Sequence, residues 1–408
     1  MTTFTPSTSE EVASIVQWAA AENEALEIVG HGSKRAIGHT IQARHLLDVS
    51  HLVGVTLYEP EELVLSARAG TPLSEIEKLL AEKNQRLAFE PMDYNPLLGG
   101  VPGRGTIGGA LAANLSGPRR LAVGAARDHI LGIEAVSGRG EAFKSGGRVV
   151  KNVTGYDLSK GMAGSWGTLA VLTSVTFKVL PATETETTLV VRGLTEDEAA
   201  AAMAAALGSS AEVSGAAHLP ENVVERVLDG TLAGDPATLL RVEGVGPSVS
   251  YRVEKLKMIQ AGPGVEELGP EASRKLWRDV RDCMPFSDGM DRPVWRVSMA
   301  PSEGHRMVAA LRMEAGADAF YDWQGGLIWL RMETDPEAET VRGLVKRFGG
   351  GHATLVRAAS RWRASVPVFE PQPPALAALS ARLKEQFDPK GILNPGRMVA
   401  PSLAGVQA

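Results

Sequence analysis

Five short strings of glycine and other small residues are the part of the sequence best suited to binding a ligand. They lie at 29–34, 105–117, 124–128, 146–157 and 161–168, and the window from 98 to 170 holds 17 of the 44 glycines. The same window carries nine Lys or Arg residues against four Asp or Glu residues. Glycine lets the backbone approach a ligand closely and exposes N–H donors, and the basic balance favours an anion. The strings therefore predict an anion site, with residues 30–34 as a nest of N–H groups.

More familiar ligand motifs do not fit. Residues 103–108 read Gly-Arg-Gly-Thr-Ile-Gly and match the dinucleotide fingerprint G-x-G-x-x-G. The preceding segment contains Pro96 and Pro102, so the buried strand that this fingerprint needs is missing. No Walker-type phosphate loop and no H-x-H or H-E-x-x-H pattern occurs. We therefore expect neither a Rossmann nor a Walker nucleotide site, and no bound metal.

Composition excludes several classes of protein. The chain has 408 residues, a net charge of −6 and 44% hydrophobic residues, which indicates a folded protein of two or three domains rather than a nucleic-acid binder. Its single cysteine, Cys283, cannot form an internal disulfide or hold an iron–sulfur cluster. No apolar run approaches 18 residues, so we expect no transmembrane segment. The expected location is the cytoplasm, with attachment to the inner membrane through partner subunits left open.

Apolar spacing predicts the elements that position these strings. Ser7 and Glu10 resemble a capping box and start a helix of about fifteen residues. Strands are expected at 26–29, 46–49, 53–58, 63–69 and 168–179, and a helix begins at Thr71-Pro72. Pro181 closes the last of these strands, and we place a domain boundary there.

The pattern beyond residue 181 predicts ferredoxin-like units. A strand at 294–299, a helix at 302–314, strands at 319–323 and 327–332, a helix at 336–348 and a strand at 353–356 give the order β-α-β-β-α-β. A looser version runs from 189 to 259. We expect a mostly antiparallel sheet with helices on one side.

The glycine strings, taken in order, resemble the FAD-binding domain of the vanillyl-alcohol oxidase/p-cresol methylhydroxylase (PCMH-type) superfamily. The matching segments are 29–34, 106–114, 151–160, 164–173 and 387–397. Within this superfamily, 146–181 and the tail are most similar to the FAD-binding subunits of bacterial glycolate oxidases. The resemblance implies an α+β fold, with a PCMH-type FAD domain at 1–181 (two α+β subdomains, about 1–57 and 58–181). An α+β cap with ferredoxin-like repeats follows at 182–374, and a helix and tail at 375–408 return to the FAD domain.

The same resemblance implies a set of FAD-binding residues. They are Gly30, His31, Gly32, Ser33, Lys34, Pro91, Met92, Thr106, Ile107, Gly108, Gly109, Asn114, Gly155, Tyr156, Asp157, Val171 and Asn394. Several members of the superfamily attach FAD through a histidine immediately before the serine of the first string. Gly32 occupies that position and the histidine is one residue earlier, so we expect non-covalent FAD.

Catalytic residues are harder to assign. Related 2-hydroxy-acid dehydrogenases carry a glycine- and histidine-rich metal motif in the cap, but the segment 349–354 has no carboxylate before His352. Arg331 and Arg357 lie on cap strands and, with His352, are the weak candidates. Arginine suits a substrate carboxylate, but we favour a solvated or subunit-facing basic edge as the role of these arginines.

Three functional hypotheses follow. In the first, the chain is the FAD-binding subunit of a heteromeric glycolate (2-hydroxy acid) oxidase or dehydrogenase that forms glyoxylate, with a catalytic flavin subunit and an iron–sulfur subunit as partners that receive the electrons. In the second, it is a self-sufficient FAD-dependent D-lactate or glycolate dehydrogenase. In the third, it is a structural subunit with an empty FAD cleft. The first two make it an FAD-dependent oxidoreductase acting on CH–OH groups.

Overall fold

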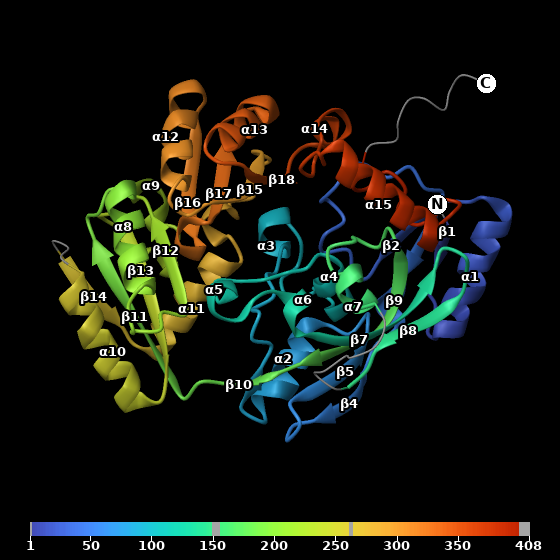
Figure 1. Ribbon diagram of the computed structural model, residues 1–408, viewed down its shortest axis with the longest axis horizontal. Helices are drawn as coiled ribbons and strands as arrows, with labels where there is room; N and C mark the ends of the chain where they lie inside the picture. The colour runs from blue at the N-terminus through green and yellow to red at the C-terminus, as the bar shows by residue number, and fades with distance from the viewer. Residues whose placement is uncertain (1, 149–155, 261–263, 400–408) are drawn as a thin grey trace.

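Two lobes make up the protein (Figure 1). The computed structural model describes residues 2–148, 156–260 and 264–399. The N-terminal lobe contains a three-stranded parallel sheet, β1–β3–β2, and a five-stranded antiparallel sheet, β4–β5–β9–β7–β8. Its strands are β1 (Thr2–Phe4), β2 (Leu26–Val29), β3 (His45–Asp48), β4 (Val55–Glu59), β5 (Val64–Arg68), β7 (Ile130–Ser137), β8 (Ala142–Gly146) and β9 (Ala170–Lys178).

Helix α1 (Ser9–Glu22) buries Val12, Val16 and Ala19 in a cluster that includes residues of β2, β3, β7 and β9, as its helical spacing predicts. The expected capping box is wrong by one residue. Thr8 is the N-cap, and its hydroxyl accepts the N–H of Glu11. Glu11 accepts the N–H of Ser7 and not that of the N-cap Thr8, so only one half of a capping box is formed.

Short helices lie between the strands of this lobe. They are α2 (Leu73–Ala81), α3 (Asn95–Leu98), α4 (Ile107–Ala112), α5 (Arg120–Val123), α6 (Ala126–His129) and α7 (Leu158–Met162), with the 3-10 turn η1 (Val49–His51). A small pair, β6 (Gln85–Arg86) with β10 (Leu180–Pro181), ends the lobe. The strand that follows Pro181 belongs to the sheet of the other lobe, so the chain passes from one lobe to the other beside the predicted domain boundary at 181. The boundary itself stays a prediction.

The cap lobe is built on one eight-stranded sheet in the order β14–β11–β13–β12–β16–β17–β15–β18. The strands are β11 (Thr185–Arg192), β12 (Gly215–Leu219), β13 (Ala237–Gly244), β14 (Gly264–Leu268), β15 (Val294–Met299), β16 (Ala317–Asp322), β17 (Leu327–Met332) and β18 (Gly351–Arg357). Each half has the strand order of a ferredoxin-like unit, which confirms the predicted fold class. The halves meet where His218 of β12 pairs with Tyr321 of β16.

Helices cover the cap sheet unequally. Helices α8 (Glu196–Leu207), α10 (Gly246–Ile259), α12 (Gly304–Glu314) and α13 (Ala338–Arg347) pack on one face. On the other face lie α11 (Pro270–Arg281), α9 (Glu221–Val224), the turns η2 (Leu228–Gly230), η3 (Met284–Phe286) and η4 (Trp323–Gly325), and the N-terminal lobe. A single hydrophobic cluster runs from the N-terminal lobe to this inner face, so the two lobes share a core.

The chain ends by returning to the N-terminal lobe. After α14 (Ser360–Ser365), helix α15 (Pro374–Phe387) crosses the surface beside β2 and β8, with no fully buried residue (Figure 1). The following segment, 388–397, is mostly buried, and Leu393 pairs with Leu26 of β2. Asp388 fixes this segment because its carboxylate accepts the N–H groups of Ile392 and Leu393.

Candidate cofactor site

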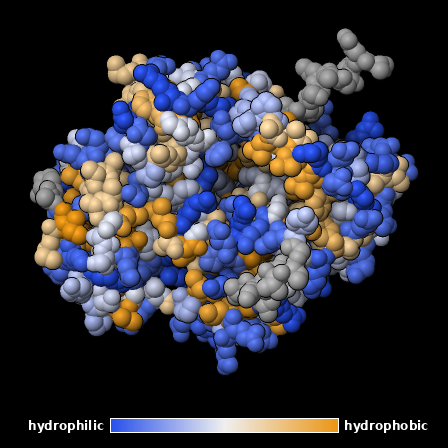
Figure 2. Space-filling model, in the orientation of Figure 1, coloured by the Kyte–Doolittle hydropathy of each residue, from blue (hydrophilic) through white to orange (hydrophobic). Residues whose placement is uncertain are grey.

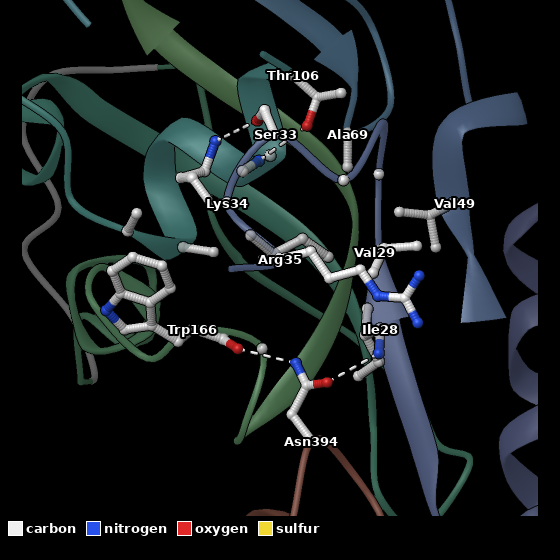
Figure 3. A pocket seen from close by; sticks show the side chains of 18 of the residues that line it. Ile28, Val29, Ser33, Lys34, Arg35, Val49, Ala69, Thr106, Trp166 and Asn394 are labelled. Carbon is white, nitrogen blue, oxygen red and sulfur yellow. Dashed lines mark hydrogen bonds between the residues drawn. The ribbon is translucent and has the colours of Figure 1, made fainter. Parts of the chain in front are cut away.

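A pocket of about 760 Å³, including the solvent at its mouth, lies where three separated segments meet (Figure 3). The turn after β2 forms one wall, the start of α4 a second, and the returning segment a third. Its lining residues are Ile28, Val29, Gly30, His31, Gly32, Ser33, Lys34, Arg35, Val49, Ala69, Thr106, Gly108, Gly109, Ala112, Ala113, Ser165, Trp166, Gly167, Ala170, Leu172, Asn394 and Arg397.

The turn after β2 presents uncommitted N–H groups to this pocket. Gly32 has φ of +75°, a left-handed conformation that glycine adopts without strain. The turn is closed by the N–H of Arg35, which donates to the carbonyl of Gly32. Within the described residues, the four backbone N–H groups from His31 to Lys34 donate to no protein acceptor. Successive free N–H groups in a turn are a binding site for an anion.

Close backbone packing brings the second glycine turn against the first. Thr106 is the N-cap of α4, and its hydroxyl accepts the N–H of Gly109 at 3.2 Å. A methyl group on Gly108 would lie 2.7 Å from Cβ of Ala69, and one on Gly30 would lie 3.0 Å from the Thr106 side chain. A side chain at Gly30 would push the two turns apart, and one at Gly108 would push α4 away from Ala69.

Positive charge accumulates in the pocket with little to balance it. Lys34 donates to the Ser33 hydroxyl at 3.0 Å, and burial lowers the pKa of its ammonium to about 8. Burial likewise lowers the pKa of Arg397 to about 10, although this guanidinium donates to the Lys34 carbonyl at 2.7 Å. Arg35 is paired with Glu27. Two desolvated cations beside free N–H groups favour a bound anion.

Two buried polar atoms also lack partners in the described part of the chain: Nε of Arg397 and Nε2 of His31. Burial and the charge of Arg104 lower the pKa of the His31 imidazole, so the neutral ring is favoured. Arg397 also lies over the Trp166 ring, 5.5 Å from its centroid.

The returning segment closes the pocket through Asn394. Its side-chain oxygen accepts the N–H of Ile28 at 2.8 Å, and its side-chain nitrogen donates to the carbonyl of Trp166 at 2.9 Å (Figure 3). Asn394 therefore joins β2 to the turn before β9, and it is only 2% exposed. Gly167 has φ of +70°, and a methyl group there would lie 2.8 Å from the Asn394 amide.

Nine of the residues predicted to bind FAD line this pocket: Gly30, His31, Gly32, Ser33, Lys34, Thr106, Gly108, Gly109 and Asn394. Ile107 and Val171 lie between lining residues, but their side chains are fully buried in the core. Pro91 and Met92 are buried, and Asn114 accepts the N–H of Arg127. Tyr156 is 91% exposed, Asp157 caps α7, and Gly155 lies outside the described residues. The assignment of all these residues to FAD stays a prediction.

Sequence reasoning missed Arg397, Trp166 and Arg35 as pocket residues. The signal for Arg397 was present, because it ends the tail segment 387–397 that matches the superfamily. Nothing in the sequence indicates that Trp166 and Arg397 stack.

The cap candidates lie elsewhere and have other partners. Arg331 forms ion pairs with Asp288 and Asp318. Arg357 donates to the carbonyls of Leu97, Phe286 and Arg292. His352 is exposed at the start of β18. None of the three lines the pocket, and a catalytic role for them stays a prediction without support from these contacts.

The described residues contain no cluster of three or more His, Cys, Asp or Glu side chains that could hold a metal ion. None of the helices described is both long enough and apolar enough to cross a membrane.

Known proteins with similar sequence or fold agree with this picture. Residues 2–146 match the FAD binding domain family. Glycolate oxidase subunit GlcE of Escherichia coli (strain K12) is 34% identical over 94% of this chain and 95% of its own length. The mitochondrial D-lactate dehydrogenase [cytochrome] of Arabidopsis thaliana is 24% identical over 97% and 73%. The solved structure of p-cresol methylhydroxylase with substrate bound has a TM-score of 0.72 at 14% identity, covering 98% of this chain and 88% of that one. The chain therefore belongs to the family of the glycolate oxidase subunit GlcE, within the FAD-binding proteins of PCMH-type fold.

Proposed function

We propose that the chain binds FAD non-covalently and serves as the FAD-binding subunit of a 2-hydroxy-acid oxidase that converts glycolate to glyoxylate. The observation that carries the proposal is the set of free N–H groups from His31 to Lys34 facing the buried cations of Lys34 and Arg397. FAD is an anion of suitable chemistry because its pyrophosphate accepts several hydrogen bonds at once. Similarity to GlcE along nearly the whole chain supports the substrate class.

The residues present fit FAD. The N–H nest and Lys34 would hold the pyrophosphate, and the orphaned Nε of Arg397 would gain an acceptor. Ile28, Val29, Ala170 and Leu172 supply the apolar wall that an aromatic ring system needs. Bound FAD would accept the two electrons released when a CH–OH group is oxidised to a carbonyl. No side chain lies at Gly32 to form a covalent link, which supports non-covalent binding.

The proposal includes partners, because the chain cannot carry electrons further by itself. Its only cysteine, Cys283, is fully buried, and an iron–sulfur cluster needs several cysteine ligands. We therefore place a second flavin subunit and an iron–sulfur subunit beside it as electron acceptors. The name of GlcE as a subunit of glycolate oxidase supports such an assembly.

The purified chain should be yellow and should release FAD into the supernatant on acid precipitation. A colourless chain that takes up no added FAD refutes the proposal and favours a structural subunit. FAD that stays with the precipitate refutes non-covalent binding. Anaerobic titration with glycolate, followed by flavin absorbance, then separates the two remaining hypotheses. Bleaching of the chain alone indicates a self-sufficient dehydrogenase, and bleaching only after partner subunits are added indicates the heteromeric oxidase.

A further inference from the structure

Four arginines lie on the inner face of the cap sheet, which faces the N-terminal lobe. They are Arg241 on β13, Arg296 on β15, Arg331 on β17 and Arg357 on β18. Side chains alternate between the faces of a strand. The neighbours of Arg296, Trp295 and Val297, belong to the cluster under α12 and α13, so Arg296 points the opposite way. A charge on a face that packs against another lobe needs a partner.

Three of these four arginines have such partners in the described structure. Arg241 binds Glu90 of the N-terminal lobe, with Nη1 donating at 3.0 Å. Arg331 is paired with two aspartates, and Arg357 donates to three carbonyl oxygens. These contacts explain Arg241, Arg331 and Arg357 as residues that hold the structure together.

Arg296 is the exception. Within the described residues its side chain makes no hydrogen bond and no ion pair, and its guanidinium instead lies 4.9 Å from the centroid of the Trp323 ring. Arg120 of α5, from the other lobe, lies 4.8 Å from the same centroid. Arg120 donates only to the Ser116 hydroxyl, at 3.1 Å. Burial and the charge of Arg296 lower the pKa of Arg120, so the two cations repel each other.

Helix α5, which begins with Arg120, lies between the lobes (Figure 1), where the molecular surface is hollowed (Figure 2).

Trp323 is held in place at a conformational cost. It has φ of 51°, a left-handed conformation that is unfavourable for a residue with a bulky side chain. Its indole N–H donates to the carbonyl of Gly117 in the other lobe at 3.0 Å. The ring is therefore fixed between the lobes, and it positions both guanidinium groups.

We propose that Arg120 and Arg296 form the recognition site for the carboxylate of the acid substrate, with Trp323 as the positioning residue. Two guanidinium groups that lie on one ring and form no ion pair within the described residues match a carboxylate, which accepts several charge-assisted hydrogen bonds. The inference rests on the proposed function, because it assumes a small 2-hydroxy acid as the ligand. It replaces Arg331 and Arg357, whose partners are protein groups.

The test is equilibrium dialysis of isotopically labelled glycolate against the full FAD-loaded chain under anaerobic conditions. Arg296→Gln and Arg120→Gln should each weaken glycolate binding by about tenfold to a hundredfold, the effect expected for one charged hydrogen bond. Arg296→Lys should retain part of the affinity. The matched control is Arg347→Gln, because Arg347 also stacks on an aromatic ring of the cap, 5.7 Å from the centroid of Phe348, but on α13. FAD content and melting temperature are measured for every variant.

Unchanged glycolate affinity in Arg296→Gln overturns the inference. If the melting temperature of that variant falls while its affinity for glycolate is unchanged, Arg296 has only a structural role between the lobes. A wild-type chain that holds FAD but binds no glycolate also overturns it, while leaving the FAD assignment intact. A chain that holds no FAD is the separate failure of the proposed function.

Discussion

Replacing Lys34 by methionine should change stability and cofactor affinity in opposite directions. Burial lowers the pKa of Lys34 from 10.5 to about 8, and the difference corresponds to about 3 kcal/mol of unfavourable desolvation at neutral pH. Solvent at the open pocket mouth screens the charge, so we expect Lys34→Met to raise the free energy of unfolding of the FAD-free chain by about 1–3 kcal/mol. Urea unfolding at pH 7 measures this.

The same variant should bind FAD more weakly. Loss of one charge-assisted hydrogen bond to a phosphate oxygen costs about 1.5–3 kcal/mol, or roughly tenfold to a hundredfold in affinity. Titration of the FAD-free chain, followed by flavin fluorescence, gives the dissociation constant. A gain in stability together with a loss of affinity would show that the lysine is retained for its ligand, at the expense of the fold.

The pH dependence provides a second measure of the same group. The folded FAD-free chain binds the Lys34 proton less tightly than the unfolded chain, so its free energy of unfolding should rise between pH 8 and 10.5 relative to Lys34→Met. The FAD affinity of the wild type should fall above pH 8 as the ammonium loses its proton, and that of the variant should not. Lys144→Met is the control, because Lys144 is exposed and paired with Glu134. A variant that is less stable and binds FAD normally would refute the reasoning.

Three other changes test the packing around the site. Gly108→Ala should destabilise the chain by about 1–3 kcal/mol in urea unfolding, because its methyl group would lie 2.7 Å from Cβ of Ala69; Gly161→Ala, which meets no atom within 4 Å, should not. Asp388→Asn should cost about 1–3 kcal/mol and expose the segment 388–397 to proteolysis, since Asp388 accepts two backbone N–H groups and the Lys384 ammonium. Glu90→Gln should cost about 1–3 kcal/mol, because it removes the charge that the buried Arg241 and Arg119 share, while Glu243 stays 3.6 Å from Arg241; a smaller loss in the background of Arg241→Met would measure the part due to that pair.

Much of the fold could be predicted because apolar spacing along a strand or helix is a local property. The strands at 294–299 and 327–332 have the bounds expected from the sequence. Strand β14 was missed because it lies at the sheet edge, carries Glu266 and Glu267, and buries none of its residues completely. An edge strand of this kind has no apolar pattern to detect.

The pocket proposed for FAD could be predicted in part, because its walls are made of backbone and glycine marks the places where two backbone segments approach closely. Val171 shows the limit of that reasoning. Ala170 and Leu172 line the pocket, and alternation along β9 turns the side chain between them into the core. The cap arginines show another limit, since only the folded chain reveals that Arg331 meets two aspartates whereas Arg296 meets a tryptophan ring.

The bond from Ile28 to Asn394 spans 366 residues of sequence, and it has a consequence for biosynthesis. Because Asn394 and Arg397 complete the pocket, a nascent chain on the ribosome lacks that wall until the whole cap has been synthesised. Under the proposed function, FAD is therefore loaded late, after the cap has been synthesised and the tail has returned to the N-terminal lobe. A product that stops short of residue 388 would contain every glycine string and still have no closed site. Cofactor retention thus reports on completion of the chain as well as on the quality of its fold.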